Sequence, residues 1–512
     1  MLYSRENIDM QPGTKRCAGS NANYHPRFRV LAGCLWLASL AGCAVGPDFS
    51  QPAAPEVDTY SRTALAEQTV ASPGRLGEAQ QILPGLPVDA QWWRAFQSDE
   101  LNALIARAFV ASPTLDRSRA TLTQAQELLG AYSGSMRLPQ VQGAAGAQRM
   151  QTSPSSQGLT GEGRQFSLYT ASVGVVYNLD IAGGIRRQEQ AYAARADLRQ
   201  YELQAAELTL AGNIATTAIS RAQLAAQHEA TSSILKAQDE QLRHARQRVR
   251  LGSASPDEAL SLAAQAEQTR AQLPVLEKKM QQADHLLAVL AGQAPAAATV
   301  PEFTLSDFSL PQKLPLRVPS ELVRRRPDIQ AAEAAMRAEN AEYGVALSRL
   351  YPQLNISASA GAQALSAGAL FGPGTAVWGL LGQLTQTLFD AGLPAQSRAA
   401  KAAFEAAAAN YQSVVLQAMR EVADALQAVD KDAQALAAMT AADAASAAAV
   451  QSVRRQFDLG VASSIELLVV QQQAQQIRVQ QVAAQAQRLA NTVALFMAMG
   501  GGNATDSGNR VK

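Results

Sequence analysis

Cysteine, aromatic side chains and charge are all scarce in this chain of 512 residues, which has three cysteines, 5% aromatic and 17% charged residues. Two cysteines, Cys17 and Cys34, lie in an N-terminal segment that we expect to be removed. The mature chain then keeps Cys43 alone and cannot form an intramolecular disulfide. A formal charge of +1 argues against a nucleic-acid-binding protein. The low aromatic content argues against a bulky globular core, and abundant alanine and glutamine favour long helices.

A catalytic or metal-binding constellation is also missing from the sequence. His228, His244 and His285 are far apart in helical patterns and lack the spacing of metal ligands, so we predict surface residues. Gly500–Gly502 is not a phosphate-binding loop, because no strand precedes it and no Lys-Ser/Thr pair follows it. We therefore predict that the protein is not an enzyme and binds no cofactor other than a covalent lipid.

The first 42 residues have the organisation of a signal peptide. Basic residues, among them Lys15, Arg16, Arg27 and Arg29, precede an apolar run from Val30 to Leu40, which is too short to cross a bilayer as a helix. The run ends in Leu40-Ala41-Gly42-Cys43, which resembles the lipobox of bacterial lipoproteins, so we expect an N-terminal lipid on Cys43. An ordinary signal peptide with an incidental cysteine is the alternative. Ala44 follows the cysteine, in place of the acidic residue that resembles an inner-membrane retention signal, so we predict that the protein is delivered to the outer membrane. Met1 and Met10 are both possible start codons.

The rest of the chain repeats itself after about 210 residues. Leu251-Gly252 returns 208 positions later as Leu459-Gly460, and Leu290-Ala291-Gly292 returns at the same lag as Ala498-Met499-Gly500. Pro139-Gln140 and Leu179-Asp180 return at lags of 213 and 210. A lag that is constant over helices and drifts only across loops indicates that one structural unit has been duplicated.

Each copy contains two segments that alternate as β-strands do. From Phe166 to Leu179, one face is continuously apolar and bracketed by tyrosines, as lipid-facing residues between interfacial aromatics would be. Its members are Tyr169, Ala171, Val173, Val175, Tyr177 and Leu179. The matching set of the second copy is Trp378, Leu380, Gly382, Leu384, Gln386 and Leu388.

The strand that precedes each of these also alternates. One face carries Val141, Gly143, Ala145 and Ala147 in the first copy and Leu354, Ile356, Ala358 and Ala360 in the second. Loops at 151–165 and 366–375 are expected to join each pair as a hairpin; a surface hairpin on a soluble domain is the plainer alternative.

Long helices follow each hairpin. The helical pattern continues from Gly184 to Leu251, which is on the order of 100 Å at 1.5 Å per residue. Ser255-Pro256 is an N-cap followed by proline at the first helical position, and it starts a second helix that returns to Leu290. The second copy repeats this pair over Leu393–Leu459 and Ser463–Met499. Rods of this length cannot be the core of a compact domain.

Four strands per chain cannot close a barrel, and open edges in lipid leave costly unsatisfied backbone groups. The chain must therefore oligomerise, giving eight strands in a dimer or twelve in a trimer. Small residues on the inner face fit an open duct, and eight strands leave an interior filled by side chains, so the trimer is favoured.

The chain closely resembles the TolC-like outer-membrane efflux proteins, in the NodT-type lipoprotein branch that serves resistance-nodulation-division pumps. The resemblance rests on motifs spread over the mature chain: Cys43–Phe49, Trp92-Trp93 with Phe96, Val318–Ile329, Phe389–Gly392 and Arg420–Leu426. It implies a channel-tunnel of the α+β membrane class, in which a 12-stranded trimeric β-barrel is continuous with a long periplasmic α-helical barrel. It also implies a passive exit duct for drugs or other toxic small molecules. Its partners would be a periplasmic membrane-fusion adaptor protein and a proton-driven resistance-nodulation-division transporter of the inner membrane.

The same resemblance points to candidate site residues. The turns Gly252-Ser253 and Gly460-Val461 are expected adaptor contacts. Ile465 and Val469, four apart on one helical face, are expected to form a periplasmic gate with Glu466 beside them. Relatives commonly carry aspartate where this chain has Val469, so the constriction is expected to be more hydrophobic. The alternative is that Ile465 and Val469 only pack against the neighbouring helix.

We accordingly divide the chain into a signal peptide (1–42), an acylated extended segment (43–90), two efflux repeats (91–300 and 326–500), an intervening linker (301–325) and a flexible tail (501–512). We predict that Arg324, Arg325 and Arg326 are solvent-exposed residues at the start of a helix rather than a patch that binds a partner. A channel for type I protein secretion or heavy-metal efflux is the alternative function, and a soluble periplasmic coiled-coil adaptor is the alternative from another class. The sequence does not identify the exported compounds.

Overall fold

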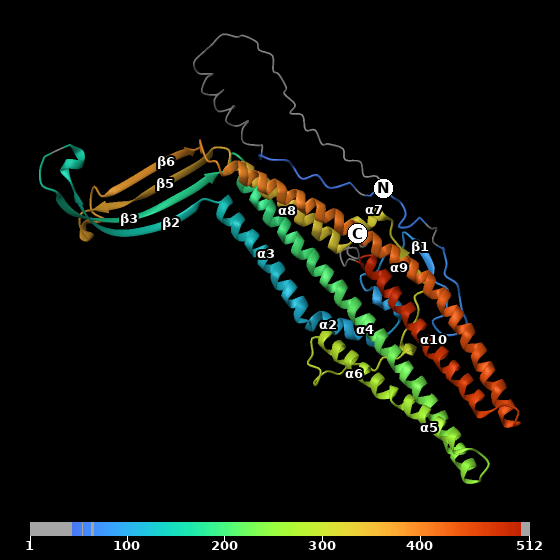
Figure 1. Cartoon of the computed structure of the whole chain (residues 1–512). Helices are drawn as coiled ribbons and strands as arrows, with labels where there is room; N and C mark the ends of the chain where they lie inside the picture. The colour runs from blue at the N-terminus through green and yellow to red at the C-terminus, as the bar shows by residue number, and fades with distance from the viewer. Residues whose placement is uncertain (1–43, 54, 63–65, 159, 503–512) are drawn as a thin grey trace, which may run out of the picture.

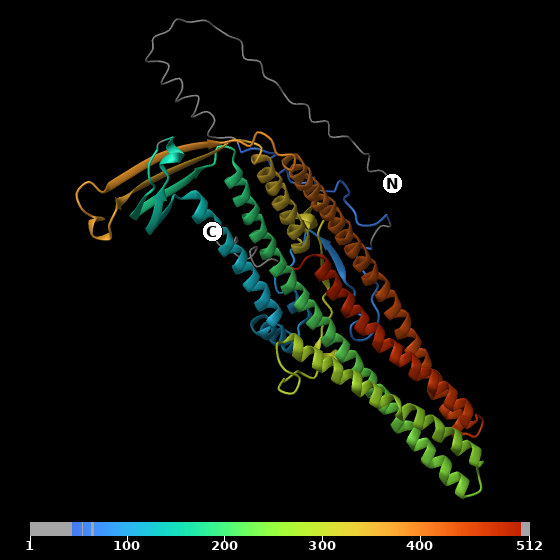
Figure 2. The ribbon, with the colours of Figure 1, turned by 60° about the vertical axis from the view of Figure 1, so that its left-hand side comes forward.

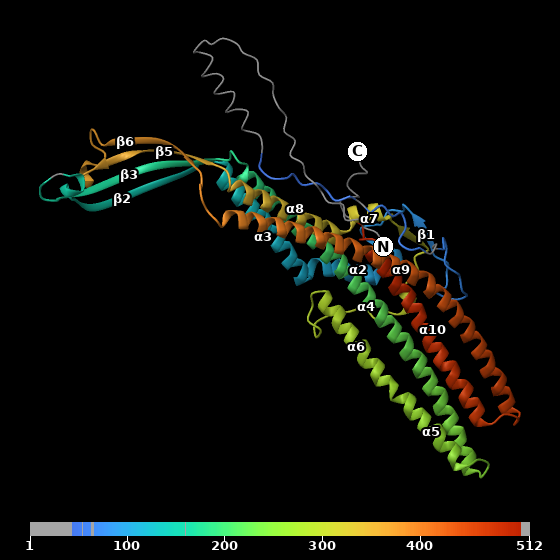
Figure 3. The ribbon, with the colours of Figure 1, turned by 45° about the horizontal axis from the view of Figure 1, so that its top comes forward.

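The computed structural model describes residues 44–53, 55–62, 66–158 and 160–502. The predicted signal peptide, Cys43 and residues 503–512 of the predicted tail lie outside the described residues. The molecule is elongated, with one β-sheet at one end and two helical hairpins turning at the other (Figure 1). Figures 2 and 3, which view the ribbon from other sides, place both hairpin turns at this same end.

Helices make up most of the rod. The α-helices are α2 (Asp99–Ala111), α3 (Pro113–Arg137), α4 (Gly184–Arg250), α5 (Pro256–Arg270), α6 (Gln272–Leu290), α7 (Pro319–Arg325), α8 (Pro327–Ser348), α9 (Leu393–Asp458) and α10 (Ser464–Ala498), and the 3-10 turns are η1 (Trp92–Phe96), η2 (Pro154–Gln157), η3 (Leu305–Asp307) and η4 (Ala367–Ala369). The rods α4 and α9 have 67 and 66 residues, so the predicted helices of about 100 Å are confirmed. Among the described residues, no helix is both long enough and apolar enough to cross a membrane.

One predicted helix is interrupted. The sequence indicated a single helix from Pro256 to Leu290, but the structure divides it into α5 and α6 at Ala271. Pro274 explains the break, because it has no amide hydrogen for the carbonyl of Arg270 and its ring displaces that carbonyl.

The larger sheet has four antiparallel strands in the order β2 (Gln140–Thr152), β3 (Arg164–Leu179), β5 (Gln353–Ala364) and β6 (Ala376–Thr385). The two predicted hairpins are present as β2–β3 and β5–β6. The two copies also pair with each other, because β3 lies directly against β5. Gln386 and Leu388, which the alternation placed on the last strand, follow its end at Thr385.

Strand register collects the apolar residues of all four strands on one face. Val173 lies opposite both Gly143 and Ala360, and Ala360 lies opposite Trp378. Since directly paired residues point to the same side of a sheet, the four apolar sets predicted from alternation share one face. The other face carries mainly polar and small residues, including Gln140, Gln142, Thr170, Ser172, Ser357, Ser359 and Gln363.

The main hydrophobic core lies midway along the rod, around Trp92 and Phe96. Trp92 stacks on Phe496 of α10 with ring centroids 5.6 Å apart, and both Trp92 and Phe96 are buried. The segment before this core is packed against the rest of the chain, whereas the sequence predicts an unpaired extended segment up to residue 90. β1 (Gln81–Pro84) pairs in parallel with β4 (Lys313–Leu316), which belongs to the predicted linker. We call residues 66–86 the strap, because they cross the helices and are fixed there by buried contacts described below.

Candidate functional site

The four-stranded sheet is the first candidate site, because its composition is unusual for a surface exposed to water. Trp378, Leu380 and Leu384 of β6 are 83%, 71% and 63% exposed on its apolar face. β3 has 16 residues, more than the 9–11 that a tilted strand needs to cross a bilayer. Within the described residues, β2 and β6 each pair with one strand only, so the sheet has two open edges.

The residues directly after Cys43 are held at the junction between this sheet and the helices. The amide of Val45 donates to the carbonyl of Ala182 at 3.0 Å, just beyond the end of β3. Arg187 of α4, which is 3% exposed, donates to the carbonyls of Val45 (3.2 Å) and Gly46 (3.1 Å) and pairs with Asp48 at 2.9 Å. These contacts hold Ala44 and Val45 at the end of the sheet from which the helices extend.

Glycines allow this close approach. Gly183 has φ +74°, and a Cβ added there would overlap Ala44. Gly46 has φ +100°, and a Cβ there would lie 3.0 Å from the Cα of Gly344. The left-handed conformation and the lack of space both favour glycine at these positions.

At the far end of the rod, α4 and α9 end in the same hydrogen-bond motif. The amides of Gly252 and Ser253 donate to the carbonyls of Val249 and Arg248. Gly460 and Val461 make the equivalent bonds 208 positions later. Both glycines have φ near +70° and open space around them, as in a Schellman cap. The four predicted contact residues are thus brought to one end of the molecule, on exposed turns.

The predicted gate residues lie on the first two turns of α10, next to these exposed caps. Ile465 and Val469 are 66% and 56% exposed on the single chain, whereas Leu467 between them is buried. Glu466 has a structural role, because its carboxylate accepts the amide of Ser463 at 2.7 Å and completes a capping box. Hydrogen bonds from Ser463 lower the pKa of Glu466 below its ordinary value.

The other half of α10 is fixed by buried polar contacts that the sequence did not reveal. Arg488 is 1% exposed and donates to the carbonyls of Leu76 and Glu78 at 2.7 Å and to the hydroxyl of Thr69 at 3.1 Å. Gln80 of the strap donates to the carbonyl of Pro311 and the hydroxyl of Thr492. The strap is therefore bound to α10 about twenty residues from the predicted gate.

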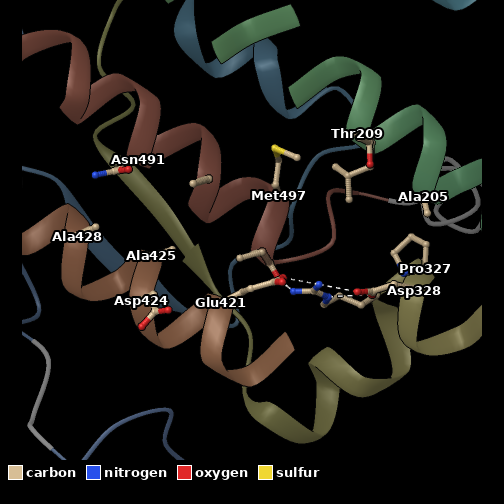
Figure 4. Close-up of a pocket in the computed structure, with 14 residues that line it drawn as sticks. Ala205, Thr209, Pro327, Asp328, Glu421, Asp424, Ala425, Ala428, Asn491 and Met497 are labelled. Atoms are coloured by element: carbon tan, nitrogen blue, oxygen red, sulfur yellow. Dashed lines mark hydrogen bonds and ion pairs between the residues drawn. The ribbon is translucent and has the colours of Figure 1, made fainter. Parts of the chain in front are cut away.

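Arg326 is buried rather than solvated, which corrects the prediction of a solvated helix entry. It is 7% exposed, pairs with Asp328 at 2.6 Å and Glu421 at 2.7 Å, and donates to the carbonyl of Ala498 at 3.0 Å. Figure 4 shows Asp328 and Glu421 pointing toward each other, with these interactions between them, beside a cavity of about 550 Å³. Arg326 thus ties α8 and α9 to the end of α10. The Arg-Pro-Asp order was the available signal, because an arginine before a proline-initiated helix can reach an acidic residue of its first turn.

Nothing in the described ranges brings three or more histidine, cysteine or acidic side chains together as a metal site would require. His228 lies 3.3 Å from Glu277, and His244 lines a groove near the first turn. The features that stand out in the described part of the chain are the apolar sheet at one end and the exposed helix caps at the other.

Comparison with known proteins agrees with this arrangement. A family model described as outer membrane efflux protein matches residues 104–293 and 318–501. Outer membrane protein OprJ of Pseudomonas aeruginosa is 28% identical over 485 residues, which cover 93% of this chain and 96% of OprJ. The pyoverdine export outer membrane protein OpmQ of Pseudomonas putida is 30% identical over 444 residues, covering 84% of this chain and 91% of OpmQ. The solved structure of the outer-membrane channel OprN superposes with a TM-score of 0.80 at 26% identity, covering 90% of this chain and 99% of that structure.

Proposed function

Because the chain belongs to the outer membrane efflux protein family, we propose that three copies close into a passive exit duct. The protein is the outer-membrane channel component of a tripartite efflux pump and works with an adaptor and an inner-membrane transporter. The four-stranded sheet is the observation that carries the proposal. It has one apolar face and two open edges, and it stands at the end of helices long enough to continue a duct away from the membrane.

Closure follows from the open edges of β2 and β6. In lipid, the unpaired backbone groups along these edges would each cost several kcal/mol. Pairing β6 of one copy with β2 of the next removes both edges. Three copies supply twelve strands, enough for a lumen, whereas two copies supply eight, whose interior is filled by side chains.

The proposed cargo is small and organic. SrpC of Pseudomonas putida, 26% identical over 91% of this chain, is named as a solvent efflux pump protein, and OpmQ is named for pyoverdine export. These names favour drugs or toxic small molecules over the alternatives of secreted proteins or heavy metals. The partners we propose are a periplasmic membrane-fusion adaptor and a resistance-nodulation-division transporter.

Co-expression with a membrane-fusion adaptor and a resistance-nodulation-division transporter from the same organism would test this function. In a strain lacking its own exit duct, the complete set should restore resistance to organic toxicants, and the set without this chain should not. Equal susceptibility of the two strains, with the protein present in the outer membrane, would contradict the proposed function.

We further propose that Cys43 carries the N-terminal lipid. The contacts of Arg187 with Val45, Gly46 and Asp48 support this proposal, because they hold the residues that follow Cys43 in the sequence at the end of the apolar sheet. Cys43→Ser should abolish acylation, so the mass of the N-terminal peptide should lose the lipid increment, while the barrel still inserts. An unacylated N-terminus in the wild-type protein would contradict the lipid assignment.

The periplasmic gate is proposed at Ile465 and Val469, whose exposure on the single chain leaves them available to face a pore. Three Val469→Asp chains would place three carboxylates at the constriction, so single channels should become more cation-selective. Val469→Asn is the matched control, because it is polar without charge and should not raise cation preference. If Val469→Asp leaves the preference unchanged, the gate lies elsewhere.

A further inference from the structure

The cavity of about 550 Å³ beside Arg326 lies between helices midway along the rod. Figure 4 shows Ala205 and Thr209 of α4 on one side of it and Asp424 and Ala425 of α9 on the other. α10 and the first turn of α8 complete its wall. A cavity of this size can hold a drug-sized molecule, because ligand sites in proteins commonly measure about 300–1,000 Å³.

The side of α10 that lines the cavity is turned away from the hydrophobic core. Asn491, Ala494 and Ala498 follow one another at three and four residues, so they share one face of the helix. Phe496, which stacks on Trp92, points to the opposite side, because two residues turn an α-helix by about 200°. Since the core fills that opposite side, the cavity faces the side left for the bore of the proposed duct.

The walls are mainly apolar, but the charged groups are mostly acidic. Of the 14 described residues that line the cavity, eight are alanine, leucine, methionine or proline. Asp328, Glu421 and Asp424 are acidic, and Arg326 is the one basic residue of this set. Arg326 bridges Asp328 and Glu421, and Arg420, outside the lining, pairs with Asp424 at 3.1 Å. Two guanidinium groups against three carboxylates leave one negative charge uncompensated in this lining.

All three carboxylates are accessible to a ligand. The side chains of Asp328, Glu421 and Asp424 are 42%, 38% and 63% exposed. Arg326 gives the first two a structural role, but it does not reach Asp424, whose exposed pair with Arg420 contributes little to stability. Folding therefore does not account for the third carboxylate.

The first copy shows that the duplicated helices do not need this charge. At the lag of 208, Glu421 and Asp424 correspond to neutral residues, Asn213 and Thr216. Asp328 follows the proline that starts α8, whereas a threonine follows the corresponding proline of α3. The rods α4 and α9 nevertheless have nearly the same length and the same cap. The acidic lining is thus a feature of the second copy.

We propose that this cavity is a binding site for small organic cations with an apolar body, which occupy it as they pass along the duct. The positive group meets Asp424 and the exposed oxygens of Asp328 and Glu421, and the apolar body packs on the alanines and Met497. A neutral compound of the same shape gains only the apolar contacts. The proposal rests on the exit-duct function proposed above, because only a lumen brings such compounds to this level of the rod.

The test uses the full-length protein in a neutral detergent and two matched probes. Ethidium is a planar cation with a permanent charge, and 3,8-diamino-6-phenylphenanthridine is its uncharged parent at alkaline pH. In fluorescence titrations corrected for detergent alone, the wild-type protein should bind ethidium about tenfold more tightly than the uncharged probe, because only ethidium gains the charge contacts.

Glu421→Gln combined with Asp424→Asn removes two negative charges, while glutamine still accepts a hydrogen bond from Arg326. This double variant should bind ethidium about tenfold more weakly and the uncharged probe about equally. Glu405→Gln combined with Asp430→Asn is the matched control, because it makes the same exchanges on α9 outside the cavity. It should change the affinity for ethidium less than about twofold.

Ala494→Leu tests the cavity without changing its charge. The larger side chain takes up space on the α10 wall, so both probes should bind about tenfold more weakly. This variant also decides the question if the double variant does not assemble.

Equal binding of ethidium by the wild type and the double variant, or equal loss in the α9 control, would overturn the proposal. Undiminished binding by Ala494→Leu would place the probe elsewhere and would overturn it too, as would equal affinity of the wild type for the two probes. Single-channel conductance separates this proposal from the exit duct. Wild-type channels that conduct but do not bind ethidium contradict the cation site alone, whereas absence of conductance contradicts the duct itself.

Discussion

Replacing Arg488 with methionine should destabilise the folded chain by roughly 1–3 kcal/mol for each buried carbonyl group that loses its donor. Methionine fills similar space but donates no hydrogen bond, so the carbonyls of Leu76 and Glu78 would be left buried without this donor. The strap should then detach from α10. Thermal unfolding in detergent and limited proteolysis within residues 66–86 measure the two effects.

Arg478→Met is the control for this prediction, because Arg478 lies on the same helix and its side chain is 56% exposed in its pair with Asp443. An exposed pair of this kind contributes about 1 kcal/mol or less. If Arg488→Met unfolds at the same temperature as Arg478→Met and the strap stays protected, the strap is held by its other contacts.

Gly292→Ala should destabilise the protein by roughly 2–5 kcal/mol, combining a left-handed backbone with overpacking. Gly292 has φ +74°, and a Cβ added there would overlap the carbonyl of Ala111 at the end of α2. Because the obstacle is backbone, no side-chain rotation relieves it. The unfolding midpoint should fall clearly below that of wild type.

Gly252→Ala isolates the conformational part of that effect. Gly252 ends α4 in the same motif with φ +71°, but nothing lies within 4 Å of its added Cβ. Gly252→Ala should therefore lower the free energy of unfolding by about 1–2 kcal/mol. Equal midpoints for the two variants would show that the contact between Gly292 and Ala111 does not constrain the fold.

Periodicity predicted the parts of the fold that local physics determines. The rods α4 and α9, the cap at Ser255-Pro256 and the alternating faces of the strands follow from hydrophobic spacing, capping residues and proline placement. The register then placed all four apolar sets on one face of the sheet, so alternation alone predicted which residues form the apolar face.

Contacts between distant segments could not be predicted in the same way. The pairing of β3 with β5 joins the two copies, and the contacts of Arg488 span about 410 positions in sequence. A buried arginine that binds backbone carbonyls has no charged partner in the sequence that would reveal it, so the sequence predicts only an extended segment where the structure has the strap. The sequence predicts a solvated Arg326 for a similar reason, since Glu421, one of the two carboxylates that pair with it, is 95 positions away.

If three sheets close into one barrel, β6 of one chain lies beside β2 of the next, and disulfide cross-linking between these two edges can detect that neighbour. Chains carrying Ala145→Cys on β2 and one cysteine scanned along β6, at Trp378, Leu380 or Leu384, would be oxidised in the outer membrane and separated under denaturing conditions. A closed trimer should give, for at least one pair of positions, a ladder of one, two and three chains that ends at three. A ladder that ends at two chains or extends beyond three, or no cross-link at any position, would contradict it.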